Sequence, residues 1–185
     1  MITGFLFADE MELADQRVLL RLDVNAPIKD GQVSDDTRIK RIIPGLRALV
    51  AARAKIIILT HFGRPKGKIV PDLSIQPVAD CMAKLLEQPV IVETDVIGAG
   101  GVAAVTALRS GNILMMENLR FYPEEEANDQ GFAKKLAILG DIYVGDAFSC
   151  AHRAHASVDA LPRLMPAAAG RSFAAELAAV HAALA

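Results

Sequence analysis

The sequence has few cysteines, little net charge and no long apolar run, and each shortage argues against a class of protein. Cys81 and Cys150 are the only cysteines in 185 residues, too few for a disulfide framework and consistent with a reducing cytoplasm. The formal net charge of -2 gives no general sign of a nucleic-acid partner, so any cationic site must be local. No apolar run approaches the roughly 18 residues that a membrane-spanning helix needs.

Targeting and linker signals are also lacking. The segment Met1 to Glu10 has neither a basic region nor a convincing apolar stretch, so we expect no signal peptide and a cytoplasmic location. No internal repeat, low-complexity tract or linker divides the sequence. The chain is 52% hydrophobic and 23% charged, and its 185 residues suffice for one well-packed domain or for a large lobe of a bigger enzyme.

Short apolar runs alternate with helical patterns along most of the chain. Strands buried on both faces are predicted over 17–23, 55–59, 89–92, 112–117 and 141–146. Helices are predicted over 37–53, 74–88, 98–109, 130–139 and 173–185. Asp30-Gly31 predicts a tight hairpin between Pro27 and Val33. The alternation predicts an α/β fold: a three-layer, Rossmann-like parallel sheet with helices on both faces, forming a single lobe.

Polar and cationic residues follow directly after four of the predicted strands. These residues are Asp23 and Asn25; His61 and Arg64; Asn118 and Arg120; and Asp146, His152 and Arg153. Because parallel strands end at the same edge of a sheet, we expect them to converge, and Arg38 in a neighbouring first helical turn can reach the same edge. Arginine binds phosphate and carboxylate bidentately, and helix N-termini add donors. Taken singly, each arginine is better explained as a solvated surface residue. Taken together, they predict a site for a small polyanion carrying phosphate and carboxylate.

Two other patterns suggest different chemistry. Gly98 to Ala103 fits a loose dinucleotide fingerprint, with Glu117 at a plausible distance. However, residues 93–95 interrupt the preceding strand, and Asp95 would repel a pyrophosphate. A glycine-rich helix start is the better interpretation.

Cys150, His152 and His155 suggest a metal site, but their spacing matches no standard zinc pattern, so we expect no metal. The acidic run 124–126 is most simply a solvated stretch that opens a loop or helix.

Five segments in a fixed order resemble the phosphoglycerate kinases. They are Arg21–Pro27, Asp35–Ile39, Thr60–Pro65, Glu117–Phe121 and Asp146–Ser157. The resemblance covers about residues 15 to 170 and implies the N-terminal, substrate-binding lobe of a two-lobed hinge kinase. It implies a substrate-binding domain over residues 1–170 and the start of an interdomain helix over 171–185.

The resemblance also implies a reaction and its partners. Members of the family move a phosphoryl group between 1,3-bisphosphoglycerate and ADP, giving 3-phosphoglycerate and ATP. Their second lobe binds the Mg-nucleotide, and this chain ends before it. We therefore expect Mg-ATP or Mg-ADP to bind through the missing C-terminal lobe, and this fragment alone to bind no cofactor and to be inactive. We expect a monomer with small-molecule substrates and no nucleic-acid or membrane partner.

The matched motifs carry roles with them. His61, Arg64, Arg120 and Arg153 would hold the remote phosphate, Asp23 and Asn25 would orient the hydroxyl and carboxyl end, and Arg38 would stabilise the transferring group as the catalytic residue. The sequence departs from the family at Ser149-Cys150, where Gly-Thr is commoner, and before Glu176-Leu177, where Met-Glu-Lys is usual. A stand-alone anion-binding module without kinase activity is the alternative.

Overall fold

Strand β1, Arg17–Leu22, lies inside a six-stranded sheet and pairs in parallel with β4, Lys55–Leu59, and with β7, Ile142–Asp146. The computed structural model describes residues 6–184. The strand order is β5-β6-β4-β1-β7-β8, and all neighbours are parallel. Residues 1–5 and 185 lie outside the described part, and with them the start of the segment expected to lack a signal peptide and the end of the helix expected over 173–185.

The remaining elements have the following bounds. The sheet is completed by β5 (Val90–Glu93), β6 (Ile113–Met116) and β8 (Ala167–Ala169), and a separate hairpin holds β2 (Ile28–Lys29) and β3 (Gln32–Val33). The α-helices are α1 (Thr37–Ala51), α2 (Gln76–Leu86), α3 (Ala99–Ala107), α4 (Pro123–Glu126), α5 (Gln130–Ala137) and α6 (Arg171–Leu184). Short turns of other helix types are η1 (Ala8–Glu10), η2 (Pro71–Leu73), η3 (Leu119–Phe121), η4 (Phe148–Cys150), η5 (Ala156–Ala160) and η6 (Leu161–Arg163).

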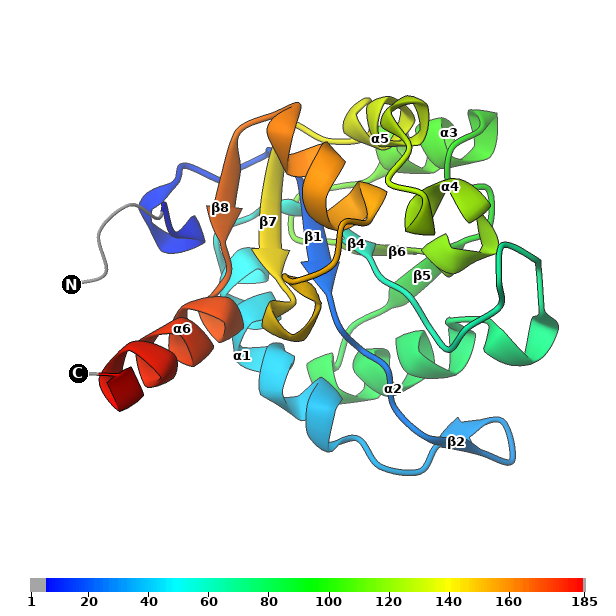
Figure 1. Ribbon diagram of the computed structural model, residues 1–185, viewed down its shortest axis with the longest axis horizontal. Helices are drawn as coiled ribbons and strands as arrows, with labels where there is room; N and C mark the ends of the chain where they lie inside the picture. The colour runs from blue at the N-terminus through cyan, green and yellow to red at the C-terminus, as the bar shows by residue number, and fades with distance from the viewer. Residues whose placement is uncertain (1–5, 185) are drawn as a thin grey trace.

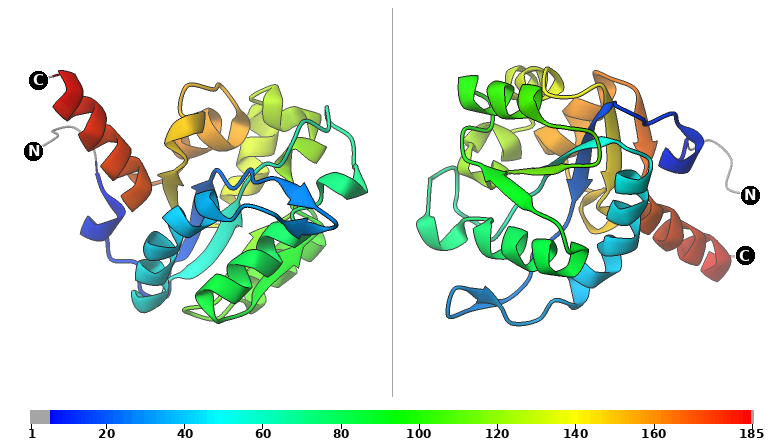
Figure 2. Two further views of the ribbon diagram at one scale, coloured as in Figure 1. Left: turned by 90° about the horizontal axis from the view of Figure 1, so that it is seen from below. Right: turned by 180° about the vertical axis from the view of Figure 1, so that it is seen from behind.

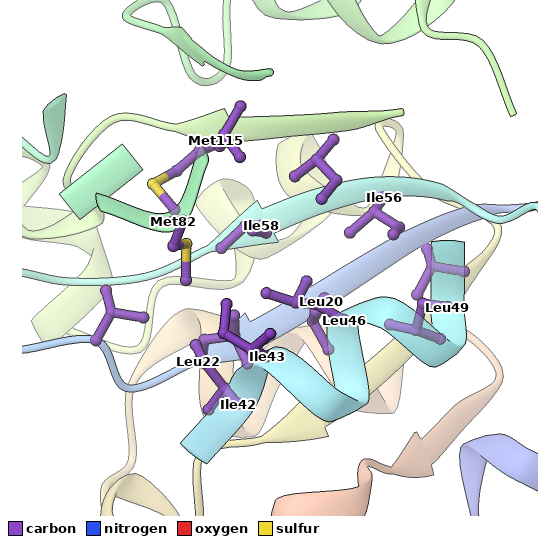
Figure 3. Packing of buried hydrophobic residues seen from close by; sticks show 14 of the residues in the cluster. Leu20, Leu22, Ile42, Ile43, Leu46, Leu49, Ile56, Ile58, Met82 and Met115 are labelled. Carbon is purple, nitrogen blue, oxygen red and sulfur yellow. The ribbon is translucent and has the colours of Figure 1, made fainter. Parts of the chain in front are cut away.

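Helices cover both faces of the sheet (Figures 1 and 2). Alternate strand residues point to opposite faces, so each strand needs apolar residues throughout. On one face Leu20 and Ile58 pack with Leu46 of α1 and Met82 of α2 (Figure 3). On the other face the core is built from strand residues and from α3, α5, η5 and η6, and includes Leu19, Ile57, Met116, Val105, Phe132, Leu136 and Leu161. The predicted three-layer α/β fold is confirmed.

The sequence prediction missed strand β8. Ala167–Ala169 is a short run of alanine, a residue depleted in strands, and it is extended because it pairs with β7 and bridges to Phe7. The tight hairpin is confirmed, because Asp30 and Gly31 adopt φ values of 52° and 72° between β2 and β3. Helix α6 projects away from the body of the molecule (Figure 2). No helix within residues 6–184 is long and apolar enough to cross a membrane.

The glycine-rich start of α3 is occupied by a side chain of the protein itself. The Asp95 carboxylate accepts hydrogen bonds from the backbone N–H groups of Gly98 at 2.9 Å and Gly100 at 2.8 Å. A Cβ atom built on Gly98 would lie 2.3 Å from Asp95 Oδ1, so the glycine makes room for this carboxylate. The amides that a pyrophosphate would need are taken, which agrees with the interpretation of this stretch as a helix start.

Asp95→Ala should lower the free energy of unfolding by about 1 kcal/mol, because it leaves backbone donors at the start of α3 without their acceptor. Urea unfolding followed by circular dichroism measures the change. Asp72→Ala is the matched control, since Asp72 is an exposed aspartate of η2, and it should alter stability by less than about 0.5 kcal/mol. Equal stability of the two variants would contradict the capping role of Asp95.

Candidate functional site

The carboxyl end of β1 carries an aspartate with several donors around it. Asp23 Oδ2 accepts hydrogen bonds from Arg38 Nη1 at 2.8 Å and from Ser149 Oγ at 2.5 Å. Its other oxygen, Oδ1, accepts from the backbone N–H of Asn25 at 3.2 Å. Arg38 therefore reaches the end of β1 from the first turn of α1, as the sequence predicted.

His61 lies just past the end of β4, next to β1 in the sheet. It is 5% exposed, and one of its ring nitrogens lies within 4.8 Å of both an Asp23 oxygen and the Cys150 sulfur. Its Nδ1 is 2.9 Å from Arg21 Nη2. Burial, followed by the charges of Arg21 and Arg120, lowers the pKa of His61 to about 3. The imidazole is therefore neutral at physiological pH.

The chain after His61 turns through a glycine that touches both ends of the site. Gly63 has φ = 59°, and a Cβ there would lie 2.8 Å from Leu73 Cδ2. Its N–H donates to Asn25 Oδ1 at 3.2 Å, and its carbonyl accepts from Arg120 Nη1 at 2.7 Å. One peptide segment thus joins the β1 end of the site to the β6 end.

Asn118 holds this loop against the end of β6. It is 0% exposed, and its Oδ1 accepts from the backbone N–H groups of Phe62 at 3.0 Å and Arg120 at 3.1 Å. Its Nδ2 donates to the carbonyls of Phe62 at 2.7 Å and Leu73 at 3.0 Å. The side chain is committed to the backbone, so Asn118, which the sequence placed at the site edge, supports the site and does not face a ligand.

Arg120 forms an ion pair with an acidic residue. It is 5% exposed, and its Nε lies 3.1 Å from Glu126 Oε1, an ion pair whose angle falls short of a hydrogen bond. Burial lowers the pKa of Arg120, with the charge of Glu126 acting in the opposite direction. Half-buried Arg153 lies close enough to Arg120 and His61 to lower the pKa of both.

Six of the seven predicted binding residues form one connected set. Contacts and electrostatic effects link Asp23, Asn25, Arg38, His61, Arg120 and Arg153. Arg64, the seventh, is exposed and follows Gly63 in the chain. Burial works to raise the pKa of Asp23, but the hydrogen bonds from Ser149 and Asn25 and the charge of Arg38 lower it overall, so the carboxylate stays ionised.

Cys150 faces partners that sequence spacing did not suggest. Within residues 6–184, the group of ligand-type side chains close enough to share an ion is Asp23, His61 and Cys150, without His152 or His155. These atoms meet because η4 follows β7 and returns over the end of β1.

Two acidic residues do not have the environment that the sequence suggested. Glu125 is 0% exposed and accepts hydrogen bonds from Ser157, so the interpretation of 124–126 as a solvated run is wrong at this position. Asp146 is buried at the end of β7 and accepts from the backbone N–H of Phe173 at 2.7 Å, which places it at the start of α6. Burial raises the pKa of Asp146.

Sequence reasoning also missed the parts played by Arg21 and Ser149. Both contact predicted site residues, Arg21 through His61 and Ser149 through Asp23. Arg21 carried a signal, because a cation inside an otherwise apolar strand is rare unless it is partnered. Ser149 carried none, since its contact depends on how η4 packs.

Comparison with known proteins gives a consistent assignment. The family model described as phosphoglycerate kinase matches residues 8–185. The phosphoglycerate kinase of Ruegeria sp. (strain TM1040) is 50% identical over 182 residues, which cover 98% of this chain and 46% of that protein. The phosphoglycerate kinase of Caulobacter sp. (strain K31) is 48% identical over 176 residues, which cover 95% and 44%. The chain thus spans less than half the length of these relatives.

Solved structures agree with the sequence relatives. The structure of phosphoglycerate kinase from Coxiella burnetii superposes with a TM-score of 0.87 at 34% identity, covering 96% of this chain and 44% of that one. Phosphoglycerate kinase from Pyrococcus horikoshii OT3 gives the same TM-score of 0.87 at 32% identity, covering 95% and 45%. From its motifs, its fold and these matches, the chain belongs to the phosphoglycerate kinase family.

Proposed function

We propose that this chain is the substrate-binding half of a phosphoglycerate kinase, which transfers a phosphoryl group reversibly between 1,3-bisphosphoglycerate and ADP to give 3-phosphoglycerate and ATP. Residues 1–170 would form the substrate-binding domain, and residues 171–185 would begin the helix toward the rest of the enzyme. We propose a cytoplasmic monomer that acts on these small molecules without a nucleic-acid or membrane partner.

One observation carries the proposal: cationic and neutral donors from several strand ends are joined by contacts at one edge of the sheet. Gly63 links Asn25 to Arg120, and Asp23 links Arg38 to the end of β1. A cluster of guanidinium groups in a chain with net charge -2 favours a small, multiply charged anion.

The proposed roles follow the two ends of this set. The remote phosphate would bind His61, Arg64, Arg120 and Arg153. Asp23 and Asn25 would orient the hydroxyl and carboxyl end, where an ionised Asp23 can accept a hydrogen bond from a substrate hydroxyl. To bind phosphate, Arg120 would exchange its contact with the exposed Glu126 for contacts with the ligand.

Arg38 is the proposed catalytic residue. Phosphoryl transfer depends on positioning and on neutralising charge, and a carboxylate acceptor needs no general base. The Arg38 side chain is 51% exposed and held by Asp23, so it can move to meet charge that develops on the transferring group.

The residues described do not fit a nucleotide phosphate at the glycine-rich start of α3, because Asp95 occupies its amides. We therefore propose that Mg-ATP or Mg-ADP binds to the part of the family's length that this chain does not cover. The nucleotide there supplies or accepts the transferred phosphoryl group. By itself, this chain should bind no nucleotide and show no turnover.

The chain should bind 3-phosphoglycerate in calorimetry at millimolar ligand, with an affinity that falls about threefold between low and high salt because exposed charges are screened. Arg153→Met should weaken binding about tenfold, since it removes charge-assisted hydrogen bonds to phosphate. Arg41→Met, which removes an exposed arginine from α1, is the control and should bind normally. Absence of binding heat in the unmodified chain would refute the proposed function.

Arg38→Met should separate binding from turnover. Because 3-phosphoglycerate lacks the transferring phosphoryl group, its affinity for this chain should change by less than about threefold. In a full-length kinase that carries this half, the same substitution should lower kcat by about 100-fold or more, a loss typical of removing a donor to developing charge. A raised KM with unchanged kcat would contradict the role.

A further inference from the structure

Arg21 is a buried cation to which the proposed binding roles assign nothing. It lies in β1 with 2% exposure, on the sheet face that Leu19 also occupies. Its guanidinium donates to Ser157 Oγ at 2.8 Å, to the carbonyl of Leu22, and to His61 Nδ1 at 2.9 Å. A charged group in such a position needs a matching charge as well as acceptors.

The matching charge is Glu125, which reaches Arg21 through one hydroxyl group. Glu125 is 0% exposed; its Oε1 accepts from Ser157 Oγ at 2.6 Å and its Oε2 from the Ser157 backbone N–H at 2.9 Å. The Ser157 hydroxyl thus donates to Glu125 and accepts from Arg21. This fixes the direction of each hydrogen bond in the network formed by Glu125, Ser157, Arg21 and His61. A buried acid and a buried base from distant parts of the chain are joined in this way.

The Arg21 end of this network determines which ring nitrogen of His61 carries the hydrogen. A guanidinium has donors and no acceptor, so His61 Nδ1 must accept from Arg21 with its lone pair. In a neutral imidazole the hydrogen is then on Nε2, which becomes the only donor of the ring. The other charged groups that act on this ring are Arg120, Asp23 and Arg153, from the elements packed around it.

This tautomer has a consequence for what His61 can bind. An Nε2–H group donates a hydrogen bond to an anion, but a metal ion needs a nitrogen lone pair, and Arg21 already uses the one on Nδ1. Asp23 and Cys150 lie within 4.8 Å of a His61 ring nitrogen, an arrangement that would otherwise suit a thiophilic ion. Arg21 thus decides between two uses of the same cluster.

We propose that Arg21 is a positioning residue: linked to Glu125 through Ser157, it holds His61 as the neutral tautomer with hydrogen on Nε2, so that His61 donates to an anion and does not ligate a metal. Only the identity of that anion rests on the proposed function. The tautomer is a property of this chain's own contacts and can be measured without adding a ligand.

The test is a long-range proton–nitrogen correlation spectrum of the nitrogen-15-labelled chain at neutral pH. The chain has 4 histidines, and His61→Gln identifies the signals of His61. We expect a protonated-type shift on Nε2 and an unprotonated-type shift on Nδ1 of His61. The reverse pattern in the unmodified protein overturns the proposal, whatever any variant does.

Substitutions separate positioning from packing. Arg21→Met removes the donors while keeping a long side chain, and the Nδ1–H tautomer of His61 should then appear. Arg21→Lys keeps a donor and should retain the Nε2–H tautomer, a rescue that a purely structural role does not predict. If Arg21→Met does not fold, Glu125→Gln is compared with the exposed control Glu124→Gln. Only Glu125→Gln should change the nitrogen shifts of His61.

A metal titration gives an independent check. Cobalt(II) added to the unmodified chain should give no sulfur-to-cobalt charge-transfer band from Cys150. A band from this residue would be identified by its loss in Cys150→Ser. A band that is lost in Cys150→Ser and also in His61→Gln would show that His61 offers a free nitrogen beside Cys150, and it would overturn the proposal. Failure of 3-phosphoglycerate to bind a chain that has the expected tautomer would refute the proposed function and leave the role of Arg21 intact.

Discussion

Parallel pairing of β1 with both β4 and β7 is the constraint on which the site depends. The register joins Val18 to Ile56 and to Ile142, so three strands run side by side and end at one edge. Asp23 and His61 leave adjacent strands there, and η4, which follows β7, brings Ser149 and Cys150 over them. A one-residue slip in this register would reverse the faces of the strand residues and separate these side chains.

The site contains several arginines, and acidic residues of the protein itself pair with many of them. Arg38 is paired with Asp23, Arg120 lies beside Glu126, and Arg21 is matched by Glu125 through Ser157. These partners differ in exposure. Glu126 is exposed, whereas Glu125 is buried in the core together with its partner.

The sequence predicted the sheet, the helices and the gathering of Asp23, Arg38, His61 and Arg120, because apolar period and strand ends are local signals. It did not predict what depends on contacts between distant segments. Alanine strand β8 depends on its pairing with β7 and on its bridge to Phe7. The burial of Glu125 depends on η5 packing over α4, and the commitment of Asn118 to backbone groups depends on the loop after β4. These are tertiary effects, which override local preference.

Gly63 has a further consequence for how the site can change. Its N–H donates to Asn25 and its carbonyl accepts from Arg120, and its positive φ disfavours any residue with a side chain. The Asn25 contact and the Arg120 contact are separated by a single residue. A change of backbone conformation at Gly63 would therefore disturb the Asn25 contact and the Arg120 contact together.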